Sequence, residues 1–162
     1  MTEKQLRVLK AMNEITSRID LNAFAQMVNL TPNQTIECVQ ELINSGLVKK
    51  AGGGYGITGK GKVVLKAIEA VPKDMAFHFH TAVGQPTGFS AESLKEFYEI
   101  VKRVTAASLE FHLYRGDFEN WIKAAFEDEA LVGKLASMKS ANVKGEELRQ
   151  EILKTIAAKY SF

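Results

Sequence analysis

Cysteine is almost absent from this 162-residue sequence, because Cys38 is its only thiol and no disulfide can form within the chain. No apolar run approaches the roughly 18 residues that indicate a membrane span. The polar residues after Met1 also lack the basic-then-apolar pattern of a signal peptide. We therefore expect a protein of the reducing cytoplasm without a membrane partner.

A large excess of charge of one sign is also lacking, since the formal net charge is only +2. The charge is unevenly distributed: residues 1–72 hold nine Lys and Arg against six Asp and Glu, whereas residues 73–162 hold twelve against thirteen. The hydrophobic fraction of 46% is that of a globular protein, so a folded chain is expected. A slightly basic first part is compatible with nucleic acid as a partner.

Residues 21–44 have the pattern of two short helices joined by a tight turn. Apolar and small side chains recur at helical spacing on both sides of the turn. They are Leu21, Phe24, Ala25 and Val28, followed by Thr35, Val39, Leu42 and Ile43. Thr31 and Gln34 are spaced as a capping box, and Pro32 suits the first helical position, so the second helix is predicted to begin there.

A glycine-rich hairpin is predicted after the second helix. Gly46 can adopt the left-handed conformation that ends a helix and returns Leu47 to the core. Residues 48–51 and 55–58 then read as two short strands around the three glycines of residues 52–54. A further short strand beside the hairpin is expected at Ser17, Arg18 and Ile19.

The segments SGLVKK and YGITGKGKVVLKAI, together with the glycine hairpin, are similar to the winged-helix family in its MarR-like and ArsR-like forms. The resemblance covers roughly the first 70 residues and includes the usual pair of helices and wing. It implies a DNA-binding domain in which the helix after the turn enters the major groove and the wing contacts the backbone or the minor groove.

Carried onto this chain, the resemblance gives two groups of DNA-binding residues. The base-facing candidates are Thr31, Asn33, Gln34 and Glu37. Asn and Gln can form paired hydrogen bonds to adenine, and Thr can reach a phosphate. The candidates for neutralising phosphates are Lys49, Lys50, Lys60 and Lys62.

Two features depart from the family's DNA-binding pattern. The helix after the turn contains no Lys or Arg, and its Glu37 and Glu41 repel phosphate. The tip of the wing, residues 52–54, is uncharged. Some winged helices serve protein assembly, so the first alternative is an interaction adaptor whose winged helix binds a protein.

The character of the sequence changes after residues 71–74, where a proline and polar residues mark a domain boundary. Residues 75–81 alternate as a strand, with Met75, Phe77 and Phe79 on one face and His78 and His80 on the other. Residues 84–88 are expected to form a loop. Helices are predicted after a cap at Ser90 or Ser93, at 118–126 after an Asp117 cap, at 129–138 and at 146–159. Residues 107–114 are compatible with a helix or a strand, and the helix is preferred.

The segments FHFHTAVGQPTGFSAESLKEFYEIVKRV and SLEFHLYRGDFENWI resemble a family of uncharacterised domains in archaeal and bacterial proteins. These domains share an aromatic strand, a helix and an EFHLxRGDFxxWI-like element. The resemblance implies a compact second domain and no particular chemistry.

The histidines provide the second alternative. His78, His80 and His112 are a possible three-histidine metal site, to which Glu110 and Asp117 can add carboxylates, and such a site would support a metal-dependent enzyme. No serine lies in a nucleophile-elbow context and no phosphate-binding loop is present in the sequence. The preferred reading is therefore not an enzyme and assigns no catalytic residue, metal or cofactor.

The sequence as a whole predicts a fold that is mostly α with small β elements. Residues 1–72 are expected to form a winged helix-turn-helix domain, and residues 73–162 a predominantly helical α+β domain with an aromatic strand. The predicted function is a DNA-binding transcriptional regulator that acts on double-stranded DNA as a homodimer, by analogy with two-half-site binders. The second domain is expected to mediate dimerisation, the binding of a small-molecule effector, or contact with a protein partner.

Overall fold

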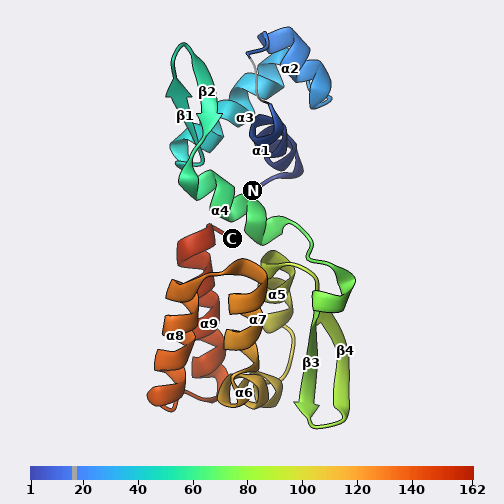
Figure 1. Cartoon of the computed structure of the whole chain (residues 1–162), viewed down its shortest axis with the longest axis vertical. Coiled ribbons are helices and arrows are strands. Elements are labelled where there is room, and N and C mark those ends of the chain that lie inside the picture. The colour runs from blue at the N-terminus through green and yellow to red at the C-terminus, as the bar shows by residue number, and fades with distance from the viewer. Residues whose placement is uncertain (16–17) are drawn as a thin grey trace. The chain divides into compact units, whose positions relative to one another are not determined.

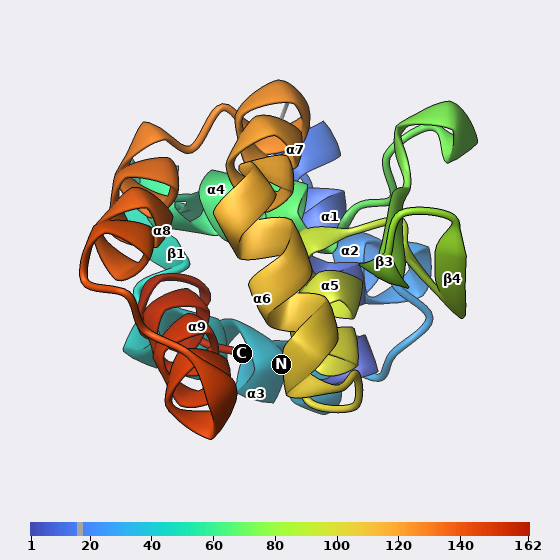
Figure 2. The same cartoon turned by 90° about the horizontal axis from the view of Figure 1, so that it is seen from below.

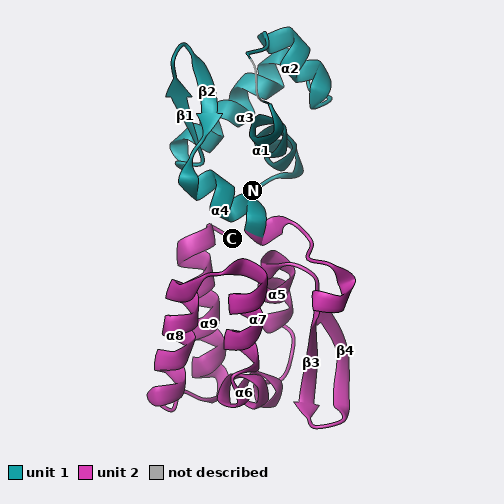
Figure 3. Ribbon diagram, in the orientation of Figure 1, with its two compact units in different colours: residues 1–66 teal, residues 67–162 magenta. Residues whose placement is uncertain are grey.

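The computed structural model describes residues 1–15 and 18–162, and these form two compact units, residues 1–66 and residues 67–162 (Figure 1, Figure 3). Helices dominate both units, and the strands of the described residues pair into two small antiparallel sheets. The predicted fold class, mostly α with small β elements, is confirmed. The division lies within a helix at Gly59–Ile68, and the sequence predicted that the first domain extends to residue 72.

The described residues of unit 1 form three helices, a β-hairpin and most of a fourth helix. These are α1 (Glu3–Glu14), α2 (Leu21–Met27), α3 (Pro32–Asn44), β1 (Val48–Ala51), β2 (Gly54–Ile57) and α4 (Gly59–Ile68). Both α1 and α2 pack on α3, and β2 also contacts α1. Buried side chains from each part, such as Leu9, Phe24, Leu42, Leu47 and Val64, form the core of this unit.

The predicted start of α3 is confirmed in detail. The Thr31 hydroxyl accepts a hydrogen bond from the Gln34 amide, and the Gln34 side chain accepts one from the Thr31 amide, each at 3.1 Å. Pro32 is the first residue of the helix, where no amide hydrogen is needed. Cys38 lies on the buried face of α3, and burial raises the pKa of its thiol, so this cysteine is a packed side chain.

The predicted end of α3 and the hairpin after it are also confirmed. Gly46 has a φ of 75°, and the Leu47 amide donates to the Leu42 carbonyl at 2.9 Å, which is the six-residue bond of a Schellman motif. Between the strands, Gly52 and Gly53 have φ values of 53° and 80°. The backbone twist of a two-residue turn with two positive φ angles matches the right-handed twist of the flanking strands. Such φ angles favour glycine at both positions.

The additional strand predicted at Ser17, Arg18 and Ile19 begins at a residue outside the described part of the chain, and neither Arg18 nor Ile19 lies in a strand. The Arg18 guanidinium instead donates to the Gly52 carbonyl oxygen at 2.6 Å. A side chain, and not a backbone ladder, therefore links this segment to the turn of the hairpin.

Gly61 in α4 is expected to be intolerant of a side chain. A Cβ atom at this position would lie 2.2 Å from the Leu47 carbonyl oxygen and 2.6 Å from Ile57 Cγ1, and the first of these is backbone. We expect Gly61→Ala to lower the free energy of unfolding by about 2 kcal/mol, although alanine favours helices. Chemical denaturation is the measurement.

Gly59→Ala is the matched control, because Gly59 lies in the same helix and a Cβ there meets nothing within 4 Å. A change in unfolding free energy within about 0.5 kcal/mol is expected for this variant. Equal stability of the Gly59 and Gly61 variants would contradict the close approach of α4 to Leu47.

Unit 2 contains a β-hairpin and five helices after a single 3-10 turn at Lys73–Met75. The strands are β3 (Phe77–Ala82) and β4 (Gln85–Ala91), and the helices are α5 (Leu94–Val101), α6 (Ala106–Arg115), α7 (Asp117–Phe126), α8 (Glu129–Ser140) and α9 (Gly145–Tyr160). Figure 2 shows α6 between α9 and β3, and α6 packs against both. The predicted helices at 107–114, 129–138 and 146–159 are confirmed within a few residues.

The predicted loop at residues 84–88 is wrong, because residues 85–91 form β4. Gly84, with a φ of 74°, occupies the turn, and β4 then pairs with β3 from Ala82↔Gln85 to Phe77↔Ala91. The register shifts on both sides of His80. Glycine and proline in residues 84–88 are typical of a loop. However, β4 is paired with a neighbouring strand along one edge, and such an edge strand can contain a proline such as Pro86 and local bulges.

An aromatic cluster joins the hairpin to the helices of unit 2. Phe77 and Phe79 on β3 contact Phe97 on α5 and Phe118 on α7, with ring centroids 4.8–6.2 Å apart. Trp121 stacks on Phe97 at 5.3 Å, and its indole N–H donates to the Met75 carbonyl at 2.6 Å. The predicted apolar face of the strand is therefore the face that packs on the helices.

No helix among the described residues is both long enough and apolar enough to cross a membrane.

Candidate functional site

One face of α3 is exposed. The helix buries Thr35, Cys38, Val39 and Leu42, and the opposite face exposes Asn33, Ile36, Glu37 and Gln40. These four positions follow the helical spacing of one surface stripe. Two of the predicted base-facing residues, Asn33 and Glu37, therefore lie together and exposed.

The other two predicted base-facing residues already have a structural role. Thr31 and Gln34 hold each other in the capping box that begins α3. The Gln34 carbonyl oxygen and the Thr31 hydroxyl oxygen are acceptors in that box, which leaves the Gln34 NH₂ and the Thr31 hydroxyl hydrogen for an outside partner.

The four predicted phosphate-facing lysines do not lie on one surface. Lys49 and Lys50 are exposed on β1, and adjacent strand residues point to opposite faces of the hairpin. Lys60 donates to the Ser45 carbonyl at 3.3 Å, at the C-terminal end of α3. Since α3 has 13 residues, Lys60 lies about 20 Å from the Thr31 cap. Lys62 lies beside a cleft next to the hairpin.

Two further residues change the electrostatics that the sequence predicted for unit 1. Arg18 adds a cation at the uncharged glycine turn through its bond to Gly52. The carboxylate of Glu41 accepts a hydrogen bond from the Gln5 side chain on α1, so one of the two α3 carboxylates is engaged inside the unit. Sequence reasoning placed Arg18 in a strand and missed both contacts, because neither partner is local.

In unit 2, three polar groups meet where α6 ends and α7 begins. His112 is 3% exposed, and its Nδ1 lies 2.8 Å from Asp117 Oδ2. Its Nε2 accepts the backbone N–H of His80 at 2.7 Å. One turn earlier on α6, the Ser108 hydroxyl donates to the His80 carbonyl at 2.8 Å. Two α6 side chains thus satisfy both backbone groups of one β3 residue.

The predicted capping role of Asp117 is wrong. Gly116, with a φ of 80°, precedes α7, and Asp117 is the first residue of that helix. The Asp117 carboxylate is directed to His112 and lies 3.5 Å from Arg115 Nε. A short polar residue after glycine signalled a cap, but the tight α6–α7 connection brings Asp117 back onto the α6 histidine.

Comparison with known families matches residues 62–157 to a family of unknown function, DUF5752. The chain belongs to this family. The match covers nearly all of unit 2, and it confirms the predicted resemblance of the second domain to an uncharacterised family. No curated protein and no solved structure matches the chain.

The geometry of the DUF5752 region defines the protonation state of His112. Because Nε2 accepts a backbone N–H, the ring carries its hydrogen on Nδ1 and donates it to Asp117. Burial lowers the pKa of His112, and the hydrogen bond and negative charge of Asp117 act in the opposite direction. The neutral His112 ring on α6 therefore forms one hydrogen bond with β3 and one with α7.

The three histidines of the metal hypothesis are near one another in the DUF5752 region, but they do not point at a common ion. Both nitrogens of His112 are hydrogen-bonded, and His80 Nδ1 contacts the His78 carbonyl oxygen at 3.1 Å. His78 Nδ1 contacts the Ser90 hydroxyl at 2.7 Å. Throughout residues 1–15 and 18–162, no three His, Cys, Asp or Glu side chains are grouped to hold a metal ion.

An open cleft of about 610 Å³ lies beside this histidine cluster. Its lining includes Phe111, Arg115, Asn120 and Trp121. The Arg115 guanidinium lies 4.7 Å from the centroid of the Phe111 ring. These groups combine an aromatic surface, a cation and an amide in the lining of one open cleft.

Proposed function

We propose that unit 1 is a winged-helix domain that binds double-stranded DNA, and that the protein is a transcriptional regulator. The observation that carries this proposal is the exposed stripe on α3, which presents Asn33 and Gln40 at the surface, where the Gln40 amide also donates to the Asn44 side chain at 3.2 Å. The helix pair before this stripe and the hairpin after it follow the order of a winged helix.

The charge of unit 1 supports the same proposal. Residues 1–66 hold nine Lys and Arg against five Asp and Glu. Lys49 and Lys50 extend from the hairpin, Arg18 lies at its turn, and Glu41 is engaged by Gln5. Attraction of phosphates to these cations supplies most of the affinity expected for random DNA.

A salt titration tests this function. We expect the protein to bind a short mixed-sequence duplex in dilute buffer and to weaken steeply as salt rises, because bound phosphates release counterions. Replacing Lys49 and Lys50 with Gln together is expected to reduce the slope of log affinity against log salt by about 2. Fluorescence anisotropy of a labelled duplex is the measurement.

Lys134→Gln serves as the control, since this exposed lysine belongs to unit 2 and carries the same change of charge. It is expected to leave the slope unchanged. A complete lack of duplex binding at low salt, or an equal effect of the control, would contradict the DNA-binding proposal.

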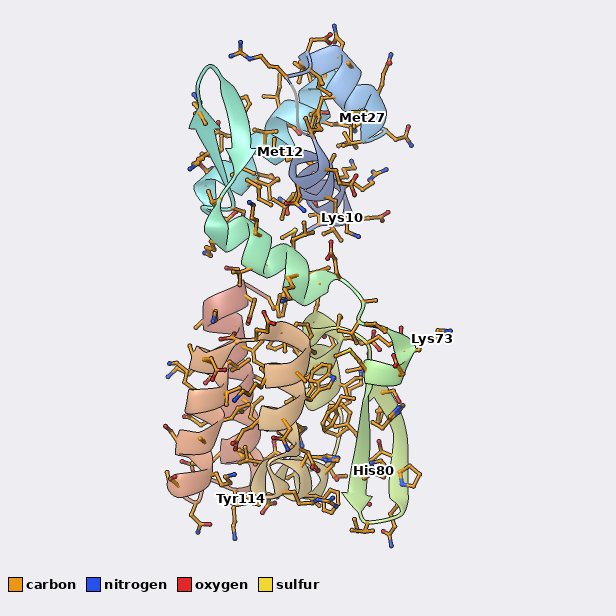
Figure 4. All side chains as sticks on the ribbon, viewed as in Figure 1. Lys10, Met12, Met27, Lys73, His80 and Tyr114 are labelled. Carbon is orange, nitrogen blue, oxygen red and sulfur yellow. The ribbon has the colours of Figure 1, made fainter. Side chains whose placement is uncertain are left out.

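A protein partner for unit 1 is the second candidate. Ile36 is 51% exposed in the centre of the α3 stripe, and Met27 on α2 is 58% exposed (Figure 4). Apolar side chains next to Glu37 suit a protein surface better than a phosphate backbone. The salt titration separates the two candidates, because an adaptor would not bind random duplex.

Unit 2 is proposed to supply dimerisation or partner contact for this regulator in the cytoplasm. A homodimer would present two copies of α3 to two half-sites, which multiplies a weak individual affinity. The proposal assigns no catalytic step to either unit. Sedimentation equilibrium of the full chain is the direct measurement of the dimer.

A further inference from the structure

A cleft of about 800 Å³ opens between the helices and the hairpin of unit 1. Its inner surface includes the buried side chains of Phe24 and Val39. Leu21, Ile36 and Tyr55 also line it and are exposed by 41%, 51% and 54%. Met12 at the end of α1 contributes a further apolar wall (Figure 4).

The size and composition of this cleft are those of a ligand site. Pockets for small molecules occupy roughly 300–1,000 Å³ and are lined mainly by apolar and aromatic groups with a few polar ones. Isolated exposed apolar side chains are common on proteins, but here several converge on one concavity. The apolar part of a small ligand would cover them.

The polar groups of the cleft favour a negative charge on that ligand. Arg18 and Lys62 both line it, and none of the described Asp or Glu side chains does. The Thr35 hydroxyl, also in the lining, already donates to the Thr31 carbonyl at 2.9 Å. An anionic group therefore finds two cations and no competing carboxylate in the lining.

The bond between Arg18 and the Gly52 carbonyl favours a small molecule over a protein segment. It joins the chain before α2 to the turn of the hairpin, and thus links two walls of the cleft at 2.6 Å. An extended peptide or a helix needs a groove that is open along its length. A compact ligand does not.

We propose that this cleft binds a small organic anion with an apolar, preferably aromatic, body and one carboxylate or sulfonate group. The apolar body lies against Phe24, Val39 and Tyr55, and the anionic group lies between Arg18 and Lys62. Because Ile36 and Gln40 belong both to the cleft and to the α3 stripe, such a ligand would exclude DNA from the stripe; this consequence alone rests on the proposed function.

A matched pair of dyes tests the site. Anilinonaphthalene sulfonate carries the anionic group, and phenylnaphthylamine has the same rings without it. We expect one sulfonate dye to bind per chain and to bind more tightly than the neutral dye. Arg18→Gln and Lys62→Gln are each expected to weaken the sulfonate by about threefold, and together by about tenfold, without affecting the neutral dye. Fluorescence titration is the measurement.

Two substitutions of exposed apolar residues locate the dye. Ile36→Ser is expected to weaken both dyes by about fivefold, because it removes apolar surface from the cleft. Val83→Ser is the control, since Val83 is 80% exposed but belongs to unit 2. Lys134→Gln controls for the loss of one positive charge.

The proposal is overturned if the folded protein binds neither dye, if both dyes bind equally, or if the control substitutions weaken the sulfonate as much as the cleft substitutions do. Dye binding without any binding of duplex supports the cleft and rejects the DNA-binding proposal. Dye binding that leaves duplex binding unchanged retains the cleft and rejects the exclusion of DNA.

Discussion

Asp128→Ala is expected to lower the free energy of unfolding by about 3 kcal/mol, the largest stability change we predict for a single side chain. Asp128 is 7% exposed and accepts hydrogen bonds from the Leu131 amide at 3.0 Å, from Lys159 Nζ at 2.5 Å and from the Tyr160 hydroxyl. Removing the carboxylate leaves buried donors without an acceptor, which costs more than the net value of the bonds themselves. Denaturant unfolding of the full chain is the measurement.

Two comparisons distinguish the loss of the three hydrogen bonds to Asp128 from a general sensitivity of α8 to substitution. Glu129→Ala, at the next and exposed position, is expected to change stability by no more than about 0.5 kcal/mol. Tyr160→Phe is expected to cost about 1 kcal/mol, because Asp128 keeps its other two donors. Equal effects of Asp128→Ala and Glu129→Ala would contradict the role of Asp128 as the anchor of α9.

Acidification is expected to destabilise unit 2 through His112. Burial lowers the pKa of this histidine below its ordinary value of 6.5, so between the two pKa values the unfolded chain binds more protons than the folded one. The contribution of His112 to the free energy of unfolding is therefore complete above pH 6.5 and is lost as the pH falls below that value. The loss approaches about 1.4 kcal/mol per pH unit at most.

The geometry gives the physical reason for this dependence. A second proton on His112 would have to lie on Nε2, which accepts the His80 backbone N–H at 2.7 Å. Two donors would then face each other, and β3 would lose one of its two hydrogen bonds to α6. The charged ring would keep only Asp117 as a favourable partner.

His112→Gln is the variant that tests this explanation, because it removes the titrating group and retains an amide. Its free energy of unfolding is expected to be lower than that of the parent at pH 7.5 and to vary less with pH between 7.5 and 5.5, values chosen as roughly one unit either side of the ordinary histidine pKa. His78→Gln, which changes an exposed histidine, is expected to keep the parent's dependence. An unchanged pH profile in the His112 variant would reject the role of this ring.

Much of the secondary structure followed from short-range signals. The capping box at Thr31 and the glycine C-cap at Gly46 act within four or five residues, so the sequence predicted them correctly. The alternation that places Phe77 and Phe79 on one face of β3 is equally local. These signals were sufficient for the mixed, mostly helical fold class.

Errors arose where a residue's partner is distant in the sequence or a local signal had two meanings. The glycine and proline of residues 84–88 are compatible with a loop and with a bulged edge strand, and only pairing with β3 decides between them. Asp117 fits a helix cap, but the α6–α7 turn directs it to His112. The three histidines are close in space, yet backbone and hydroxyl partners occupy their ring nitrogens.

The sequence by itself determined the start and end of α3, the apolar faces of the helices and of β3, and the resemblance of the second domain to an uncharacterised family. The tertiary structure decided which polar side chains remain available, because it pairs Lys60 with Ser45 and His112 with His80. It also decided that the apolar side chains beside α3 surround an open cleft. Local propensity acts over a few residues, whereas hydrogen-bond partners and cavities depend on segments that meet only after folding.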